Sequence, residues 1–199
     1  MKVAELPQIG TPLAGGFYAG RFQNAAAHFA LIVSPAAGDI EGTWGEPGKM
    51  LDGCRNFVDG KQNTIDLAEA GSELARLLMQ LDINGFTDWF LPARDQLELL
   101  YRNLKPTTEE TWGSYMDGHN THSVPPGDLY TNGKPVQTDI VAFQEDGDHA
   151  LHDTWYWTST QYSAHNAFCQ DFGDGYQYGL GKSNELRARA VRQIQLVIE

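Results

Sequence analysis

The chain has 199 residues, of which 41% are hydrophobic, 11% aromatic and 20% charged. A chain of this length suits one domain and buries enough apolar surface to fold without a metal ion or a disulfide. Its 14 Lys and Arg residues against 26 Asp and Glu residues give a formal net charge of −12. This charge argues against a nucleic-acid partner and against electrostatic docking to anionic lipid.

The N-terminal segment predicts neither a secretion signal nor a membrane anchor. Residues 1–7 carry one lysine and no apolar run of the length that a signal peptide needs. The longest apolar run of the chain, residues 29–33, is too short to cross a bilayer, so we expect no membrane insertion. Pro7 and Pro12 favour an extended N-terminal arm over residues 1–12, followed by a single domain over residues 13–199.

Two segments have the periodicity of helices. Between Thr64 and Leu81, leucine and alanine recur every three or four residues, which predicts one helix with an apolar face. A second helix is predicted from Ala93 to Leu104. Pro92 is expected in its first turn, where a missing N–H costs little.

Apolar or alternating runs predict strands on both sides of these helices. Because strands and helices are segregated along the chain, the order indicates an α+β fold rather than a βαβ alternation. We predict two helices, a twisted antiparallel sheet and a long irregular loop region. The predicted strands are residues 16–22 and 28–33, then 154–160, 167–172, 176–178 and 187–197.

Residues 105–150 have no sustained periodicity, which predicts a long insertion with one short strand at residues 141–143. A loop of this length is usually functional or packed by its own side chains. The acidic segment 144–153 includes His149 and His152, but their spacing matches no recognised metal-ligand pattern. We therefore predict no metal ion and no cofactor, and ion binding by the acidic segment stays open.

The two cysteines, Cys54 and Cys169, are too few for a disulfide scaffold and too scattered for a zinc site. Two interpretations stay open: two small buried side chains, or one long-range disulfide. No nucleophile elbow surrounds Ser159 or Ser163, and the chain contains no phosphate-binding loop. Because no nucleophile with its base can be named, we predict that the chain is not an enzyme.

Three motifs follow one another in the order of a known family. They are the turn Asp88-Trp89-Phe90-Leu91-Pro92, the strand Tyr156-Trp157-Thr158-Ser159-Thr160 and the closing segment Arg187-Ala188-Arg189-Ala190-Val191-Arg192. These motifs resemble the Lcl C-terminal domain family, which is found in bacterial surface proteins and phage genomes. The resemblance covers about residues 50–195. It implies a C-type-lectin-like fold in which the N- and C-terminal strands are adjacent and the long loop forms one face.

Six residues of these motifs are predicted to be structural. We expect Asp88 to accept hydrogen bonds from backbone N–H groups of its turn, and Trp89 and Leu91 to put one face of the segment into the core. Phe90 stands where the family usually has Arg, and Ala190 stands near a usual Cys, which lowers the expectation of a disulfide. The six residues are Asp88, Trp89, Leu91, Pro92, Trp157 and Arg192.

The C-terminal strands carry candidate binding side chains on or beside hairpin turns. Tyr and Asn combine rigid amphipathic area with adaptable hydrogen bonding, as antibody loops do. In phage variable proteins of C-type-lectin fold, the corresponding strands display the ligand-binding face. The alternative is that several of these tyrosines pack on the core with only the hydroxyl exposed. The candidates are Tyr162, His165, Asn166, Tyr176, Tyr178 and Asn184.

Together with the resemblance, these residues predict a non-enzymatic binding module of a phage or prophage virion, in a tail, fibre or baseplate. Its partner is expected to be a host cell-surface protein or glycan, and homo-oligomers are compatible with the sequence. One alternative is a structural virion component that docks on other virion proteins through the N-terminal arm. The other is a formylglycine-generating-type enzyme, which needs Cys54 or Cys169 as a reactive thiol with a depressed pKa.

Overall fold

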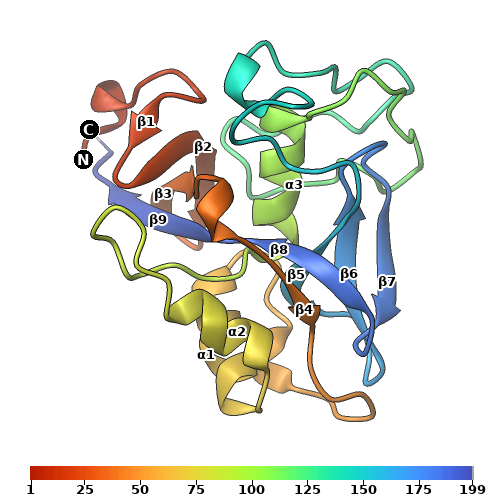
Figure 1. Ribbon diagram of the computed structural model, residues 1–199. Helices are drawn as coiled ribbons and strands as arrows, with labels where there is room; N and C mark the ends of the chain where they lie inside the picture. The colour runs from red at the N-terminus through yellow and green to blue at the C-terminus, as the bar shows by residue number, and fades with distance from the viewer. Residues whose placement is uncertain (199) are drawn as a thin grey trace.

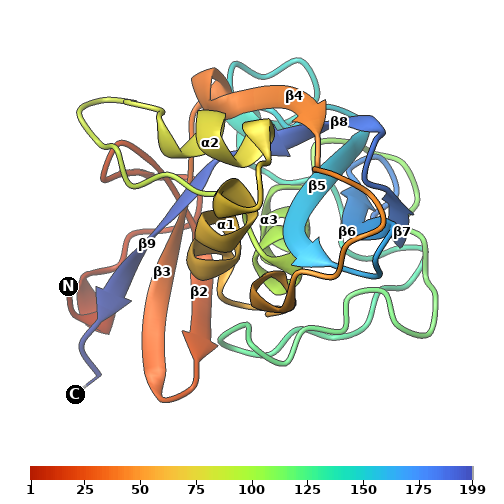
Figure 2. The ribbon, with the colours of Figure 1, turned by 90° about the horizontal axis from the view of Figure 1, so that it is seen from below.

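Two sheets organise residues 1–198, which the computed structural model describes (Figure 1, Figure 2). The first sheet has the strand order β1-β2-β3-β9, and the second has the order β4-β8-β5-β6-β7. All neighbouring strands are antiparallel except β5 and β8, which are parallel. The predicted α+β class is confirmed, with curled antiparallel sheets and three α-helices within the described residues.

Along the chain, β1 to β3 form part of the first sheet, β4 to β8 form the second sheet, and β9 returns to the first. The first sheet contains β1 (Pro12–Leu13), β2 (Gly16–Asn24), β3 (Ala27–Val33) and β9 (Val191–Leu196). The second contains β4 (Asp39–Thr43), β5 (Trp155–Gln161), β6 (Asn166–Asp171), β7 (Gln177–Gly181) and β8 (Glu185–Arg189). The helices are α1 (Gly60–Glu69), α2 (Glu73–Met79) and α3 (Arg94–Leu104).

The predictions of one sheet and of one continuous strand over residues 187–197 are wrong. The chain leaves the second sheet at the end of β8 and enters the first sheet at β9, with Ala190 between them. The N–H of Ala190 donates to the carbonyl of Gly38, and its carbonyl accepts from the N–H of Ser34. Both partners lie in the connection between β3 and β4, so this connection marks where the chain crosses between the sheets.

The single helix predicted over residues 64–81 is also wrong, because it is divided into α1 and α2. Gly71 lies between them with φ +104°, a conformation that breaks a right-handed helix. Ser72 then caps α2, and its Oγ accepts from the N–H of Ala75 at 3.3 Å. The helix predicted from Ala93 agrees with α3 within one residue, although Pro92 precedes its first turn rather than lying in it.

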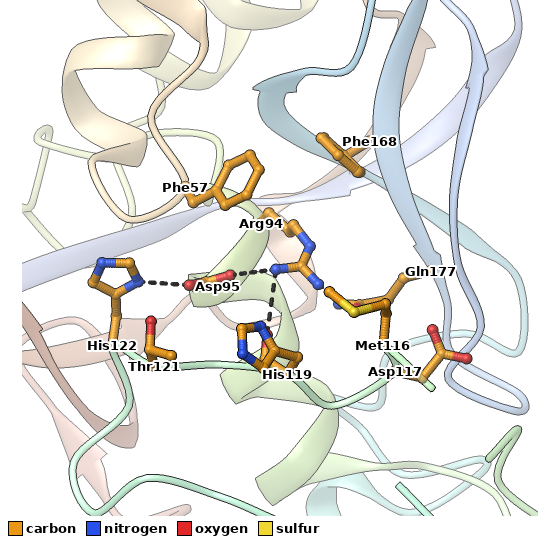
Figure 3. A pocket seen from close by; sticks show the side chains of 10 residues that line it. All are labelled: Phe57, Arg94, Asp95, Met116, Asp117, His119, Thr121, His122, Phe168 and Gln177. Carbon is orange, nitrogen blue, oxygen red and sulfur yellow. Dashed lines mark hydrogen bonds and ion pairs between the residues drawn. The ribbon is translucent and has the colours of Figure 1, made fainter. Parts of the chain in front are cut away.

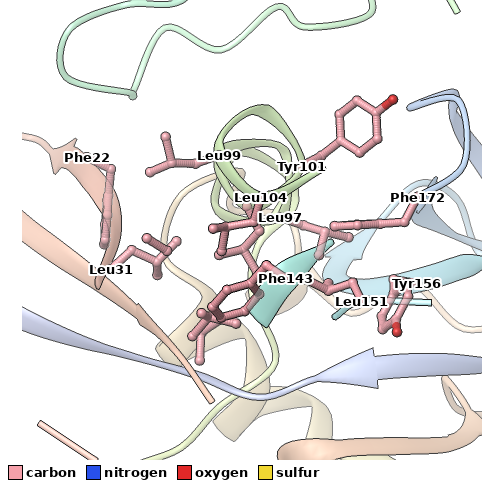
Figure 4. Close-up of a cluster of buried hydrophobic side chains, with 14 of the residues drawn as sticks. Phe22, Leu31, Leu97, Leu99, Tyr101, Leu104, Phe143, Leu151, Tyr156 and Phe172 are labelled. Carbon is pink, nitrogen blue, oxygen red and sulfur yellow. The ribbon is translucent and has the colours of Figure 1, made fainter. Parts of the chain in front are cut away.

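Two large hydrophobic clusters lie on either side of the segment that enters α3. The first packs the apolar side of α3 against β2, β3 and the long irregular segment (Figure 4). The second packs α1 and α2 against the second sheet. Phe90 belongs to the first cluster, whereas Trp89 and Leu91 belong to the second. Both faces of this segment are therefore buried, where the sequence predicts one.

The first twelve residues are packed onto the first sheet rather than projecting as an arm. They contain a 3-10 helix, Val3–Glu5, and Val3 and Leu6 pack against buried side chains of β2, β3 and β9. Lys2 forms an isolated bridge with Val197, so the two ends of the chain lie side by side (Figure 1). Their apolar side chains are the physical reason, since packing removes them from water.

The long segment 105–150 is irregular, and the predicted strand at its residues 141–143 is a 3-10 helix instead. Its own side chains Tyr130 and Phe143 are buried in the first hydrophobic cluster. It also joins the first sheet, because Ser123 forms an isolated bridge with Phe22 of β2. No helix within residues 1–198 has both the length and the apolar character needed to cross a bilayer.

Candidate functional site

A cavity of about 370 Å³ opens at the N-terminal end of α3 (Figure 3). Four parts of the chain line it: the segment before α1, the start of α3, the long irregular segment and the β6–β7 pair. We call it the Arg94 pocket. Its lining residues are Phe57, Arg94, Asp95, Met116, Asp117, His119, Thr121, His122, Phe168 and Gln177.

Arg94 joins three of these segments through its guanidinium group (Figure 3). Its Nη1 donates to Asp95 Oδ1 at 3.0 Å and to the carbonyl of His119 at 3.3 Å. Its Nη2 donates to Gln177 Oε1 at 3.0 Å. The side chain of Arg94 is buried, and charge-assisted bonds of this kind are strong where water is excluded. Arg94 is therefore held in one orientation in the lining of the pocket.

Two aromatic rings flank the same guanidinium group. Its carbon Cζ lies 5.3 Å from the ring centre of Phe57 and 5.9 Å from that of Phe168. These distances are within the range of cation–π attraction. The two rings also contact each other edge to face, with centres 5.5 Å apart. The pocket thus combines an apolar wall with an oriented cation.

Asp95 forms the second charged element of the pocket and pairs with two groups. Its Oδ2 lies 2.6 Å from Nδ1 of His122, and its Oδ1 accepts from Arg94. Burial raises the pKa of Asp95 above its ordinary value, and the neighbouring His122 and Arg94 offset part of that rise. Its position in the first turn of α3 also favours the ionised carboxylate through the helix dipole.

A buried network holds the long segment in place at the rim of the pocket. Asn120 donates from Nδ2 to the carbonyl of Asp95 at 2.8 Å and to the carboxylate of Glu98. The hydroxyl of Tyr130 donates to Glu98 at 2.9 Å, and Arg102 forms an ion pair with Glu98 at 2.7 Å. Burial raises the pKa of Glu98, which the ion pair with Arg102 and these hydrogen bonds partly offset.

The pocket wall also contains an incompletely paired carboxyl group, that of Asp117. Its Oδ2 is buried and accepts no hydrogen bond from the described residues. Burial raises the pKa of this group, although hydrogen bonds from Ser114 and from the backbone of Gln177 oppose the shift. Such a group is costly unless it finds a donor.

The residues predicted to bind ligand do not converge on the Arg94 pocket. Tyr162 comes nearest, because its ring contacts Phe168 with centres 5.0 Å apart. Asn166 and His165 lie at the β5–β6 turn, and Asn184 is exposed in the turn between β7 and β8. The predicted group is thus dispersed over the hairpin turns.

Tyr176 and Tyr178 lie on the other face of the β6–β7 pair. In register, Phe168 is opposite Gly179 and Cys169 is opposite Tyr178. Residues directly opposite share a face, and successive residues alternate between faces. Phe168 lines the pocket on one face, so Cys169 and Tyr178 belong to the other face.

Among the motif residues predicted to be structural, Asp88 does not act as predicted. Its carboxylate accepts from Arg192 Nε at 2.7 Å and Nη2 at 3.1 Å, instead of from backbone N–H groups of its turn. The guanidinium carbon of Arg192 also lies 4.1 Å from the ring centre of Phe86. A bidentate pair between distant segments satisfies both partners better than a single local bond. Trp89 and Trp157 are buried in the second hydrophobic cluster.

The cysteines are free, so the disulfide interpretation is wrong and the interpretation as buried side chains is correct. Burial raises the pKa of Cys54 and of Cys169 to about 12 in each case. No cluster of three or more potential metal ligands occurs within residues 1–198, including the described acidic segment 144–153.

Sequence reasoning did not identify the Arg94 pocket. Arg94 and Asp95 stand in the turn-helix motif but lie outside its six predicted structural residues, and His119 and His122 were two of six dispersed histidines. One signal was available. Asp95 and Glu98 are three residues apart, so a helix brings their two carboxyl groups to the same side.

The chain has little detectable similarity to known proteins. No family model matches the chain, and no curated protein matches its sequence. Among solved structures, it is similar to a fimbrial protein from Bacteroides ovatus, with a TM-score of 0.47 and 12% sequence identity. The match covers 82% of this chain and 35% of that chain, so the chain spans about a third of that protein's length.

Proposed function

We propose that this protein is a non-enzymatic binding module of C-type-lectin-like fold that recognises a host surface ligand through the Arg94 pocket. The ligand is a host cell-surface glycan or protein. A phage or prophage virion is the proposed location, on the basis of the family resemblance alone. The adjacent terminal strands and the long segment at one side support the proposed fold.

One observation supports the binding function most. The Arg94 pocket places an oriented guanidinium between two aromatic rings, in a cavity of about 370 Å³. Ligand sites typically combine an apolar lining with a few fixed polar groups in this way. The ring of Phe57 and the side chain of Met116 are exposed and offer apolar contact area. Arg94, His119, Thr121 and Gln177 offer polar groups beside it.

The alternatives have less support. A structural role through an N-terminal arm is weakened because residues 1–12 pack on their own sheet. A formylglycine-generating-type enzyme needs a thiol with a depressed pKa, whereas burial raises the pKa of both thiols. Among the described lining residues, Thr121 provides the one hydroxyl that could act as a nucleophile. No hydrogen bond joins this hydroxyl to His122, whose Nδ1 contacts Asp95 instead.

The test measures binding of fluorescently labelled protein to intact cells from a panel of bacterial strains. Phe57→Ala and His119→Ala should weaken saturable binding roughly tenfold each, because both side chains line the pocket and anchor residues dominate binding energy. Leu77→Ala is the control, since Leu77 is an exposed apolar residue of α2 outside the lining of the pocket. Thermal unfolding establishes that all variants are folded.

Two outcomes would contradict the proposal. If Tyr178→Ala abolishes binding while Phe57→Ala does not, the ligand site is elsewhere. If the protein binds to no strain and co-purifies instead with assembled phage particles, the alternative of a structural virion component is preferred.

A further inference from the structure

A second surface, distinct from the Arg94 pocket, lies on the opposite face of β6 and β7. Its rings form a connected group, in which Tyr176 contacts Trp112 at 5.4 Å, Trp155 at 6.1 Å and Tyr178 at 5.8 Å between ring centres. We call Trp112, Trp155, Tyr176 and Tyr178 the aromatic platform. Trp112 and Tyr178 are each 52% exposed, so about half of each large ring remains in contact with water. A group of large apolar side chains exposed together is unusual on a surface that binds no partner.

The platform is held rigidly by backbone pairing. Trp155 is opposite Asp171 in the register of β5 and β6, and the N–H of Asp171 donates to the carbonyl of Tyr176. The N–H of Trp112 donates to the carbonyl of Asp174 at 2.6 Å, which fixes the long segment to the β6–β7 turn. The backbone that carries these rings is therefore fixed before any partner binds, which lowers the entropic cost of binding.

The platform borders an acidic cleft of about 410 Å³. Trp112 lines this cleft together with the carboxylates of Glu110 and Asp174 and with Asn132, and the described lining residues include no Lys or Arg. The nearby ammonium group of Lys105 is buried beside the lining residue Thr111, donating to Thr111 Oγ1 at 2.9 Å and to the carbonyl of Glu109, and Lys105 is not among the lining residues. The exposed Lys134 lies in the turn after Asn132 and is outside the lining.

We propose that the aromatic platform and this cleft bind a basic segment of a protein partner. An Arg or Lys side chain of that segment lies over the indole of Trp112 and pairs with Glu110, while Tyr178 contacts the apolar stem of a neighbouring residue. Cations are attracted to aromatic faces and to carboxylates, and here both are present at one place. A second copy of this chain is disfavoured, because its net charge of −12 opposes self-association.

The test is a titration with a hexaarginine peptide, followed by Trp fluorescence and by calorimetry at two salt concentrations. Hexaglutamate serves as the peptide control. Trp112→Ala and Glu110→Gln should each weaken hexaarginine binding by a factor of about 3 to 30, the range expected for a cation–π contact or a charge-assisted bond. Two matched controls remove a similar group nearby: Tyr115→Ala, a ring that is 87% exposed outside the platform, and Glu109→Gln, the adjacent exposed carboxyl group.

The proposal is overturned if hexaarginine binds the Trp112→Ala variant as tightly as the wild type, because binding is then a response to net charge alone. It is also overturned if Glu109→Gln weakens binding as much as Glu110→Gln does, or if no saturable binding occurs. The substituted side chains are exposed, so loss of fold is not expected. The peptide measurement is independent of the cell-binding test of the Arg94 pocket, so either proposal can fail alone.

Discussion

The charged residues around the Arg94 pocket differ in how completely they are paired. Asp95 has both Arg94 and His122 as partners, and Glu98 has Arg102, Asn120 and Tyr130. Asp117 keeps one buried oxygen without a hydrogen bond from the described residues. A buried ionised oxygen without a donor costs free energy, so Asp117 is a site where charge is unfavourable for folding.

We predict that Asp117→Asn raises the free energy of unfolding at neutral pH by about 1 kcal/mol. The folded pKa of Asp117 lies above its ordinary value of 3.8, so its protonated form stabilises the fold. That contribution is complete below 3.8 and is lost as the pH rises through the folded pKa. The gain from the substitution should therefore disappear as the pH falls.

Urea unfolding between pH 3.5 and pH 8 would measure this difference. Asp128→Asn removes an exposed carboxyl group from the same segment and should change stability by less than about 0.5 kcal/mol. If Asp117→Asn raises the free energy of unfolding by the same amount at every pH, ionisation of Asp117 is not the cause of the gain.

At the scale of elements, the division between α1 and α2 positions the second hydrophobic cluster. The hydroxyl of Ser72 donates to the carbonyl of Trp44 at 2.7 Å and also accepts from the N–H of Ala75. It thereby joins the start of α2 to the segment after β4. Leu67 of α1 and Leu74 of α2 belong to the same cluster, on either side of the break at Gly71.

Gly71→Ala is predicted to destabilise the protein by roughly 1–2 kcal/mol. The cost arises from backbone conformation alone, because Gly71 has φ +104° while an added Cβ meets nothing within 4 Å. Gly133→Ala is the matched control: its added Cβ also meets nothing, and its φ is not in the left-handed region. Chemical denaturation should show a change of less than about 0.5 kcal/mol for the control. Equal effects at both positions would disprove the conformational argument.

At the scale of the whole molecule, a buried ionic group joins the two sheets to the long segment. Arg189 of β8 donates to Asp39 of β4 at 3.1 Å, to the carbonyl of Ser34 after β3 at 3.1 Å and to the carbonyl of Ala150 at 2.7 Å. The hydroxyl of Tyr156 also donates to Asp39, at 2.7 Å. Arg189 therefore satisfies acceptors that belong to three different parts of the fold.

Arg189→Met is predicted to lower the free energy of unfolding by about 3 kcal/mol or more, because it removes the fully buried cationic partner of Asp39 and the donor to the carbonyls of Ser34 and Ala150. Arg187→Met is the matched control, since Arg187 pairs with the same Asp39 at 3.1 Å but its side chain is 33% exposed, against 0% for Arg189. The control should lose about 1 kcal/mol or less. Urea midpoints compare the two variants, and similar losses would show that burial is not the deciding factor.

The sequence by itself determined the local features of this protein. The leucine spacing predicts α3, the period of two predicts the C-terminal strands, and Pro92 and Ala93 locate the start of α3 within one residue. These features depend on neighbours in the chain, which the sequence lists directly. The sequence also contains Gly71 within the predicted helix, but the left-handed conformation of Gly71 depends on the packing of α1 and α2 on the sheet.

Only the tertiary structure decided which of these residues form a site. Arg94 and Gln177 are 83 positions apart, and Asp95 and His122 are 27 positions apart. Strand alternation predicts that Tyr176 and Tyr178 share a face, but not which face the long segment covers. That segment follows buried contacts such as Asn120 with Glu98, and these contacts place the Arg94 pocket on one side of β6 and β7 and the aromatic platform on the other.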